Sequence, residues 1–440
     1  MLPTKRSNRI KKISGTLNFS KIYEKFLAEV MIIDMAPSSD PSQYGNERGI
    51  STQHYLINMI NRILTCLNKN NSKEAFAVIT HLVDWNQAFD RQCPTLGINS
   101  FIKNGVRKSI IPVLTNYFQD REMTVKWRGV FSSVRKLPGG GPQGCHLGGL
   151  EYGSQSNDSG NCVQDIDRYK FVDDMSLLEV VNLITCGLAS YNFRNHVASD
   201  IGVEQKYLPP SNIQSQDYLH SVEKWTEDRM MKLNKKKTKV IIFNFTKDYQ
   251  FSSRLYMQDS LLEIVTETKL LGCLVSSDLT WWKNTNNITR KGYQRLEIIR
   301  KLYNFKVPLK DLAQIYALYV RSILEFNSCV WHFSITQAEC DDIERVQRVA
   351  CKIMLKSDYS TYESALEKLS LQNLYERRKT LCLKFAQNCL NHEKTKGMFP
   401  LKTPSSYALR NNEKYQVNFA STDRLLKSSI PMMQRMLNEN

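Results

Sequence analysis

The sequence lacks paired cysteines. Its 11 cysteines are scattered, and no two of them have the spacing of a CxxC motif. This excludes common zinc-finger patterns and gives no sign of a disulfide framework, so it indicates a reduced intracellular protein of the nucleus and/or cytoplasm. Cys382, Cys389 and His392 could belong to a metal site, but a fourth ligand at suitable spacing is missing and the segment has a helical pattern. We prefer packing as their role.

Long apolar runs and acidic excess are also missing. No uninterrupted apolar stretch reaches the ~18 residues that a membrane span needs, so we expect no membrane association. The basic start, MLPTKRSNRIKK, is not followed by the apolar segment of a secretory signal. Lys and Arg number 60 against 43 Asp and Glu, a formal charge of +17. Such an excess favours a polyanionic partner such as nucleic acid, although a merely soluble basic protein has the same signature.

What is present suffices for a large core, since 42% of residues are hydrophobic and 10% aromatic. Periodicity predicts a helical opening part and then a buried strand, residues 76–83, that ends at Asp84. Ser51 is expected to cap the second helix. The remaining predicted elements are helices at 17–36, 51–67, 86–106 and 107–120, a hairpin at 122–137 with Arg128-Gly129 near its turn, a hairpin at 168–181, a helix at 218–233 and a strand at 240–245.

Residues 151–167 are rich in Gly, Ser and Asn, so we expect a loop outside the core. Long helical patterns dotted with Arg and Lys cover 284–355 and 361–395. The whole is predicted to be an α+β protein with a mixed unit over 1–280 and a helical unit over 281–440.

Two adjacent carboxylates, Asp173 and Asp174, stand inside the apolar hairpin of 168–181. Burying both is costly unless a cation lies between them and a third acid. Asp84, at the end of another strand, can supply that acid, and Mg²⁺ prefers such oxygen ligands. An exposed turn is the alternative for an isolated Asp-Asp pair. The apolar flanks favour the metal site.

Five segments together resemble the reverse transcriptase family in order and spacing. They are VDWNQAFD (83–90), LPGGGPQGCHLGG (137–149), FVDD (171–174), MKLNKKKTKVIIF (231–243) and KLLGCLVSSDLTWW (269–282). Later segments resemble the region that follows the polymerase in non-LTR, LINE-type retrotransposon proteins. The resemblance implies a right-hand polymerase with a palm sheet flanked by helices, helical fingers and a helical thumb-like C-terminal region.

The resemblance also implies an activity. It is RNA-directed DNA polymerisation, in which deoxynucleoside triphosphates are added to a primer 3′ hydroxyl by two-metal nucleotidyl transfer. The implied cofactor is a pair of Mg²⁺ ions, with Mn²⁺ as a substitute. The implied partners are an RNA template and a DNA primer or target.

The resemblance assigns roles to eight residues. Asp84, Asp173 and Asp174 would bind the metal ions and act as the catalytic residues. Phe89 would lie under the sugar of the incoming nucleotide and exclude a 2′ hydroxyl. The remaining substrate-binding positions are Gln143 and Gly144 in the glycine-rich loop, Lys237 near the triphosphate, and Lys11 in the fingers.

The glycine-rich loop and the basic helices can also be interpreted from residue chemistry. Gly139–Gly141 are expected to expose backbone amides to phosphate or sugar. The helical tail offers a basic track for duplex phosphates, and Trp281, Trp282, Trp331 and Tyr319 are expected to be core residues rather than stacking platforms. Candidates for the track are Arg290, Lys291, Arg295, Arg300, Lys301, Arg321, Arg345, Arg348, Arg377 and Arg378. For Asp90 we prefer a helix-dipole role over a catalytic one.

Two departures from the family pattern support an alternative. Lys11 stands where the family has an arginine, which replaces a bidentate fork by a point charge. The chain also has no room for an upstream endonuclease, so it resembles a polymerase fragment. The alternative function is therefore a truncated, inactive nucleic-acid-binding relic. Because the carboxylate set is intact, we favour the enzyme.

Overall fold

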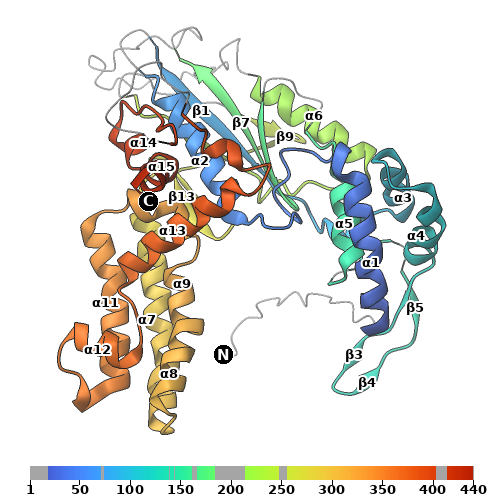
Figure 1. Ribbon diagram of the computed structural model, residues 1–440. Coiled ribbons are helices and arrows are strands. Elements are labelled where there is room, and N and C mark those ends of the chain that lie inside the picture. Colours follow the sequence, from blue (N-terminus) through green and yellow to red (C-terminus); the bar gives the residue numbers. More distant parts are fainter. Residues whose placement is uncertain are drawn as a thin grey trace, which may run out of the picture.

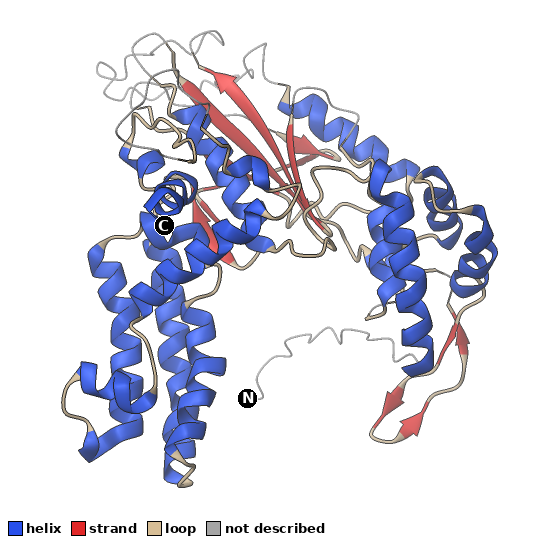
Figure 2. Cartoon of the chain, in the orientation of Figure 1, coloured by secondary structure: helices blue, strands red, loops and turns tan. Residues whose placement is uncertain are grey.

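The computed structural model describes residues 18–70, 74–137, 139–142, 144–160, 166–183, 214–246, 255–402 and 414–439. It contains a mixed sheet between two groups of helices (Figures 1 and 2). The strands are β1 Phe76–Val83, β2 Glu122–Met123, β3 Lys126–Trp127, β4 Val130–Phe131, β5 Arg135–Lys136, β6 Asp167–Phe171, β7 Asp174–Asn182, β8 Lys239–Phe243, β9 Tyr256–Met257, β10 Ser260–Leu261, β11 Glu263–Val265, β12 Glu267–Leu270 and β13 Cys273–Ser276.

The α-helices are α1 Asn18–Met35, α2 Thr52–Leu67, α3 Pro94–Lys103, α4 Ile111–Phe118, α5 His146–Gln155, α6 Ser215–Asp228, α7 Trp282–Asn304, α8 Leu309–Ile315, α9 Ser322–Leu324, α10 Ser328–Trp331, α11 Gln337–Leu355, α12 Tyr362–Leu369, α13 Leu374–Leu390, α14 Asp423–Leu426 and α15 Ser429–Glu439. A π-helical segment, Tyr316–Arg321, joins α8 to α9.

The central sheet has five strands in the order β11-β8-β1-β7-β6. β1 pairs antiparallel with β7 and with β8, and β6 pairs antiparallel with β7. Successive side chains of β1 point to opposite faces, as strand geometry requires. Val78 joins a core with α2 and the C-terminal helices, while Ala77 and Ile79 join a second core with α6. Both faces of the sheet are therefore covered.

A third apolar cluster lies in the helical group of α1, α3, α4 and α5. Beyond it projects the β3–β4 hairpin, seen at the lower right of Figure 1. Arg128 and Gly129 form its turn with positive φ values of 48° and 88°, which suits a tight two-residue hairpin turn.

Most predicted elements are confirmed, including the helix capped by Ser51, the strand that ends before Asp84 and both hairpins. The helices expected at 86–106 and 107–120 are shorter, α3 and α4. Pro94 occupies the first position of α3, and Pro112 lies in the first turn of α4, where proline is tolerated. The α+β class is confirmed.

The prediction of a loop over residues 151–167 is wrong in its first part. Residues 151–155 complete α5, and its small and polar residues are packed in the interior. Glycines permit this close packing: a Cβ on Gly148 would lie 2.2 Å from the carbonyl oxygen of Pro142. Small residues thus mark a tight helix contact here and not a loop.

Candidate active site

Strand register brings two of the three predicted aspartates together. Val83 of β1 lies opposite Met175 of β7. The next residue along each strand end, Asp84 and Asp174, therefore occupies the same edge of the sheet. Asp173 stands in the β6–β7 turn beside them. Residues almost 90 positions apart thus converge because the two strands are antiparallel.

Charge coupling among the three carboxylates is strong. Burial raises the pKa of Asp174 to about 6, and repulsion from Asp173 and Asp84 adds to the effect. Burial also raises the pKa of Asp84, although the ammonium of Lys237 opposes the shift. Both carboxyl groups are thus electrostatically unfavourable when ionised without a cation.

Lys237 lies beside Asp84, and its expected role near the triphosphate stays a prediction. Its Nζ lies 3.7 Å from Asp84 Oδ2, and most of its side chain is exposed. The preceding turn is tied to the aspartate, since Asn234 N donates to Asp84 O (2.8 Å) and Asp84 N donates to Thr238 Oγ1 (3.2 Å). The ammonium of Lys237 therefore reaches Asp84 from a turn that its own hydrogen bonds hold in place.

Phe89 lies close by and stacks on Tyr152, with ring centroids 4.9 Å apart. All three aspartates raise the pKa of Tyr152 in addition to burial, so its phenol lies within their field. The sequence did not single out Tyr152, because it falls in the segment taken for a loop. Neither a motif nor apolar periodicity marks this tyrosine in the sequence.

The glycine-rich loop is packed differently from the prediction. Gly140 N donates to Gln92 O (2.8 Å) and Gly141 N to Phe89 O (2.7 Å), so these amides are engaged within the protein. The prediction that the amides of Gly140 and Gly141 are exposed to phosphate or sugar is therefore wrong. Because these glycines have no Cβ atom, the loop can pack closely against residues 89–92. This packing holds Phe89 in place. Gly144 has a φ of 90°, a conformation that favours glycine.

The donor set fits a hard divalent cation. It consists of three carboxylates, and the buried Oδ2 of Asp84 accepts no hydrogen bond from the described residues. However, no group of three or more His, Cys, Asp or Glu side chains within the described part of the chain is arranged to hold a metal ion as it stands. The aspartates are thus coupled through charge but not closed around a shared point.

The other predicted positions divide into two sets. Gln143 and Lys11 lie outside the described residues. In the basic track, Arg378 is wrong as a surface contact, because it is 0% exposed and its guanidinium lies over the Trp331 ring. Trp281 and Trp331 are core residues as predicted, whereas Trp282 and Tyr319 are exposed and that prediction is wrong.

Cys382 and Cys389 are fully buried in the core. His392 lies 3.6 Å from Glu47 and beside the carbonyl of Arg48. Each side chain thus has a packing or polar contact of its own.

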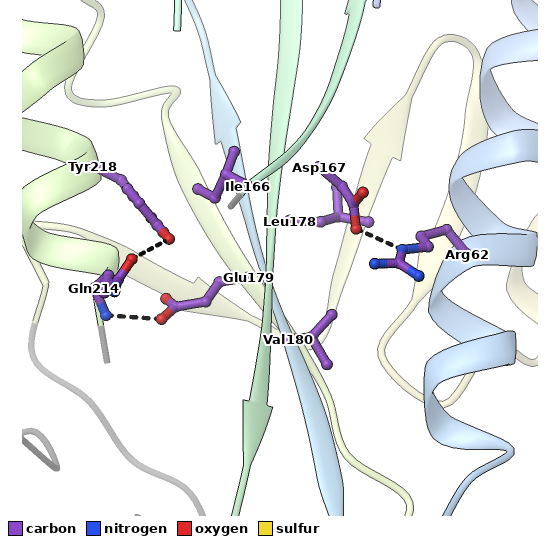
Figure 3. A pocket seen from close by; sticks show the side chains of 8 residues that line it. All are labelled: Arg62, Ile166, Asp167, Leu178, Glu179, Val180, Gln214 and Tyr218. Carbon is purple, nitrogen blue, oxygen red and sulfur yellow. Dashed lines mark hydrogen bonds and ion pairs between the residues drawn. The ribbon is translucent and has the colours of Figure 1, made fainter. Parts of the chain in front are cut away.

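A separate pocket of about 440 Å³ opens at the other end of β7 (Figure 3). Its polar groups are paired with one another: Arg62 with Asp167 at 2.5 Å, and Gln214 N with Glu179 at 2.7 Å. Tyr218 donates to the side chain of Gln214. It therefore offers no catalytic set comparable to the aspartates.

Comparison with known proteins agrees with the motifs. No protein-family model matches the chain. A Drosophila melanogaster protein named as a probable RNA-directed DNA polymerase from transposon BS is 24% identical over 85% of this chain and 39% of its own length. A second, from the X-element transposon of the same organism, is 22% identical over 80% of this chain and 36% of its own. The chain thus spans less than two-fifths of either relative.

Among solved structures, a telomerase from Candida tropicalis in complex with a TWJ fragment of telomeric RNA is similar to this chain. The match covers 96% of this chain and 54% of the telomerase chain. Its identity is 10% and its TM-score 0.40, a likeness too low to carry an argument.

Both curated relatives carry names that agree with the motifs. The resemblance to reverse transcriptases, predicted from five ordered motifs, is confirmed. Both relatives are named as probable RNA-directed DNA polymerases from transposons, which agrees with the predicted resemblance to retrotransposon proteins. No helix in the described ranges is long and apolar enough to cross a membrane.

Proposed function

We propose that the chain is an RNA-directed DNA polymerase of a non-LTR retrotransposon. The observation that carries the proposal is the β1–β7 register, which sets Asp84 beside Asp174 while Asp173 occupies the adjoining turn. Residues 1–280 would form fingers and palm, and 281–440 the thumb. The protein would act in the nucleus and/or cytoplasm.

Asp84, Asp173 and Asp174 would hold two Mg²⁺ ions, which supply activation of the primer 3′ hydroxyl and stabilisation of the leaving pyrophosphate. The aspartates are suited to this because their mutual repulsion falls when positive charge binds. Mn²⁺ would substitute.

The other roles concern the incoming deoxynucleoside triphosphate. Phe89, backed by Tyr152, would exclude a 2′ hydroxyl by its bulk. Lys237 would offset the triphosphate charge, since its exposed ammonium is free to move from Asp84. Gln143, Gly144 and Lys11 would complete the substrate contacts.

The β3–β4 hairpin is a candidate contact for the RNA template or DNA primer. Trp127 and Phe131 are 66% and 62% exposed. Residues 123–137 contain four cations and no acid, and Lys126 lies over the Phe131 ring. Exposed rings among cations are typical of surfaces that bind single strands.

The test is primer extension on an RNA template with deoxynucleotides and Mg²⁺. We expect Asp173→Asn to reduce extension by at least about a hundredfold. The matched control is Asp259→Asn, an exposed turn position with φ of 61° that asparagine tolerates. Wild-type protein that extends nothing, or an unchanged Asp173→Asn variant, would contradict the proposal.

The alternative is a non-catalytic relic that binds nucleic acid. It is favoured by one observation, that the aspartates are not closed around a metal position within the described structure. It predicts salt-sensitive RNA binding that persists without Mg²⁺ and is indifferent to Asp173→Asn. Extension and RNA-binding measurements on wild type and Asp173→Asn therefore distinguish the polymerase from the relic.

A further inference from the structure

A loop far away in sequence braces the hairpin that carries Asp173 and Asp174. Tyr44 N donates to Lys170 O (2.7 Å), and Lys170 N donates to Ser42 O (2.9 Å). Residues 40–45, hereafter the bracing loop, thus pair with the edge strand β6. The aspartate turn begins two residues after this pairing.

The turn itself is strained. Val172 has a φ of 57°, which is rare for a β-branched residue because its side chain crowds the backbone. The side chain of Gln43 holds both of its backbone groups: Val172 N donates to Oε1 (2.9 Å), and Nε2 donates to Val172 O (3.5 Å). Strain of this kind persists where surrounding contacts fix it, and it is frequent at functional sites.

The approach of the bracing loop leaves no room for a side chain at Gly45. A Cβ there would lie 2.4 Å from Val172 N and 2.6 Å from Val172 Cγ2. Gly45 N also donates to Gln43 Oε1 (2.8 Å), so the amide that grips Val172 is itself oriented. The contact is therefore a specific fit of backbone against backbone.

A buried ion pair anchors the same region. Lys170 is 2% exposed, and its Nζ lies 2.6 Å from Asp40 Oδ2. Burial alone would raise the pKa of Asp40, but the ammonium of Lys170, together with the Ser42 amide and Arg168, holds the pKa below its usual value. Arg168 adds a second cation 3.6 Å from the same oxygen.

The ammonium also binds the end of α5. Lys170 Nζ donates to the carbonyl oxygens of Ser156 (3.0 Å), Asn157 (3.1 Å) and Ser159 (3.0 Å). These carbonyls follow the C-terminus of a helix, where a cation is favourable. The N-terminus of the same helix begins two residues after Gly144. One side chain therefore joins the aspartate hairpin, the bracing loop and the helix that follows the glycine-rich loop.

A buried ion pair is weak evidence for a purely stabilising role, because a well-packed apolar pair is often as stable. An apolar residue at position 170 would, however, lose the bonds to three helix-end carbonyls. Lys170 therefore connects the aspartate hairpin and the bracing loop to the end of α5.

We propose that Lys170, held by Asp40, is a positioning residue that fixes the Asp173–Asp174 turn relative to α5 and the glycine-rich loop. This inference rests on the proposed polymerase function. Lys170 does not touch substrate, so its effect reaches the reaction through the placement of the aspartates.

The experiment compares Lys170→Met, the double variant Lys170→Met/Asp40→Asn, and wild type. The single variant leaves Asp40 buried and unpaired and should melt at lower temperature. The double variant removes both charges and should recover part of the loss, since the three helix-end carbonyls still lack their donor. Its extension rate should nevertheless stay at least about tenfold below wild type, because small misplacements of catalytic groups are costly.

Three readouts separate positioning from stability. In the double variant, amide hydrogen exchange in residues 168–178 should be at least tenfold faster, and the Mg²⁺ concentration for half-maximal extension should rise. The KM for deoxynucleotide should change less than kcat. Asp34→Asn is the control: it breaks the ion pair with Arg107, 2.7 Å long and remote from the turn, and should alter none of the three.

The inference is overturned if the double variant regains both melting temperature and wild-type values of all three readouts. If the double variant does not fold, Gln43→Met serves instead, because it leaves the ion pair intact and removes the side-chain bonds of Gln43 to Val172 and to Gly45 N. Unchanged exchange in that variant would overturn the bracing-loop argument. Should wild type extend nothing, the proposed function fails, whereas the exchange comparison still decides the role of Lys170.

Discussion

At the scale of single residues, Glu151 is the unusual acid outside the aspartate edge. It is fully buried in α5, and burial raises its pKa to about 8. Its Oε2 accepts no hydrogen bond from the described residues; among the same residues, Gln92 Oε1 accepts none and Gln92 Nε2 donates none. A Cβ on Gly97 or Gly141 would crowd this carboxyl, so two glycines make space for it.

Glu151 should make stability depend on pH. The folded protein keeps its proton up to about pH 8, whereas the unfolded chain releases it near pH 4.5. Stability therefore falls as pH rises from about 4.5 to about 8 and is fully present only below that range. We expect Glu151→Gln to remove on the order of 2–4 kcal/mol of this fall, measured by denaturant unfolding at pH 5 and pH 8.

The control for that prediction is Glu24→Gln. Glu24 is similarly buried but accepts hydrogen bonds from Tyr117 and His146 N, so its replacement should lower stability through the loss of these two bonds. An equally steep pH dependence in Glu151→Gln and wild type would show the assignment to be wrong.

Local patterns account for what sequence could predict at this scale. Asp84, Asp173 and Asp174 each end or interrupt an apolar run, so periodicity and turn chemistry reveal them. Glu151 and Lys170 were not predicted, because their environments are made by partners far away in sequence. Lys170 meets Asp40 130 positions earlier, and nothing in the sequence around either residue indicates the pair.

At the scale of elements, the β3–β4 hairpin is the clearest candidate for contact with nucleic acid. Both of its exposed rings carry a neighbouring cation, Lys126 over Phe131 at 5.0 Å and Arg128 over Trp127 at 6.0 Å. Its base is linked to the glycine-rich loop, since Arg121 donates to Gly140 O (2.9 Å). A strand held by the hairpin would thus be held close in structure to the substrate loop.

We expect Trp127→Ala/Phe131→Ala to weaken binding of single-stranded RNA by about tenfold or more, because each stacked base contributes roughly 1–3 kcal/mol. Fluorescence anisotropy with a labelled oligonucleotide measures this. Phe419→Ala, which removes an even more exposed ring elsewhere (85%), should leave affinity unchanged. Equal losses in the two proteins would contradict the assignment.

Element boundaries illustrate the limits of prediction at this scale. The apolar strand of residues 76–83 and both hairpins were placed correctly. The helix α5 was not predicted, because Gly, Ser and Asn usually indicate a loop. Its close packing against α1 and α3 explains why small residues occur there.

At the scale of the whole molecule, α2 connects the sheet to the C-terminal helices. Thr52 Oγ1 donates to Asn327 (3.0 Å), and Ser421 N and Thr422 N donate to Asn68 (3.0 and 3.1 Å). One apolar cluster includes residues of α2, the sheet, α7, α11 and α13. The division of the chain at residue 280 into two functional units stays a prediction. The apolar cluster, however, contains residues from both sides of this position.

A fragment of residues 1–280 should therefore not fold cooperatively by itself, because its α2 would expose an apolar face. Thermal melting with near-UV circular dichroism and dye binding tests this. Co-expression with residues 281–440 should restore a cooperative transition. A fragment that melts sharply with little dye binding would show that each part has an independent core.

The bracing loop has one more consequence. β6 is the outermost strand of the central sheet, and a bare outer strand presents backbone groups that can pair with the same strand of another molecule. Tyr44 N and Ser42 O occupy the carbonyl and amide of Lys170 at that margin. The loop that braces the aspartate turn thus also guards the protein against edge-to-edge association between copies, so variants that loosen it would be expected to aggregate as well as to lose activity.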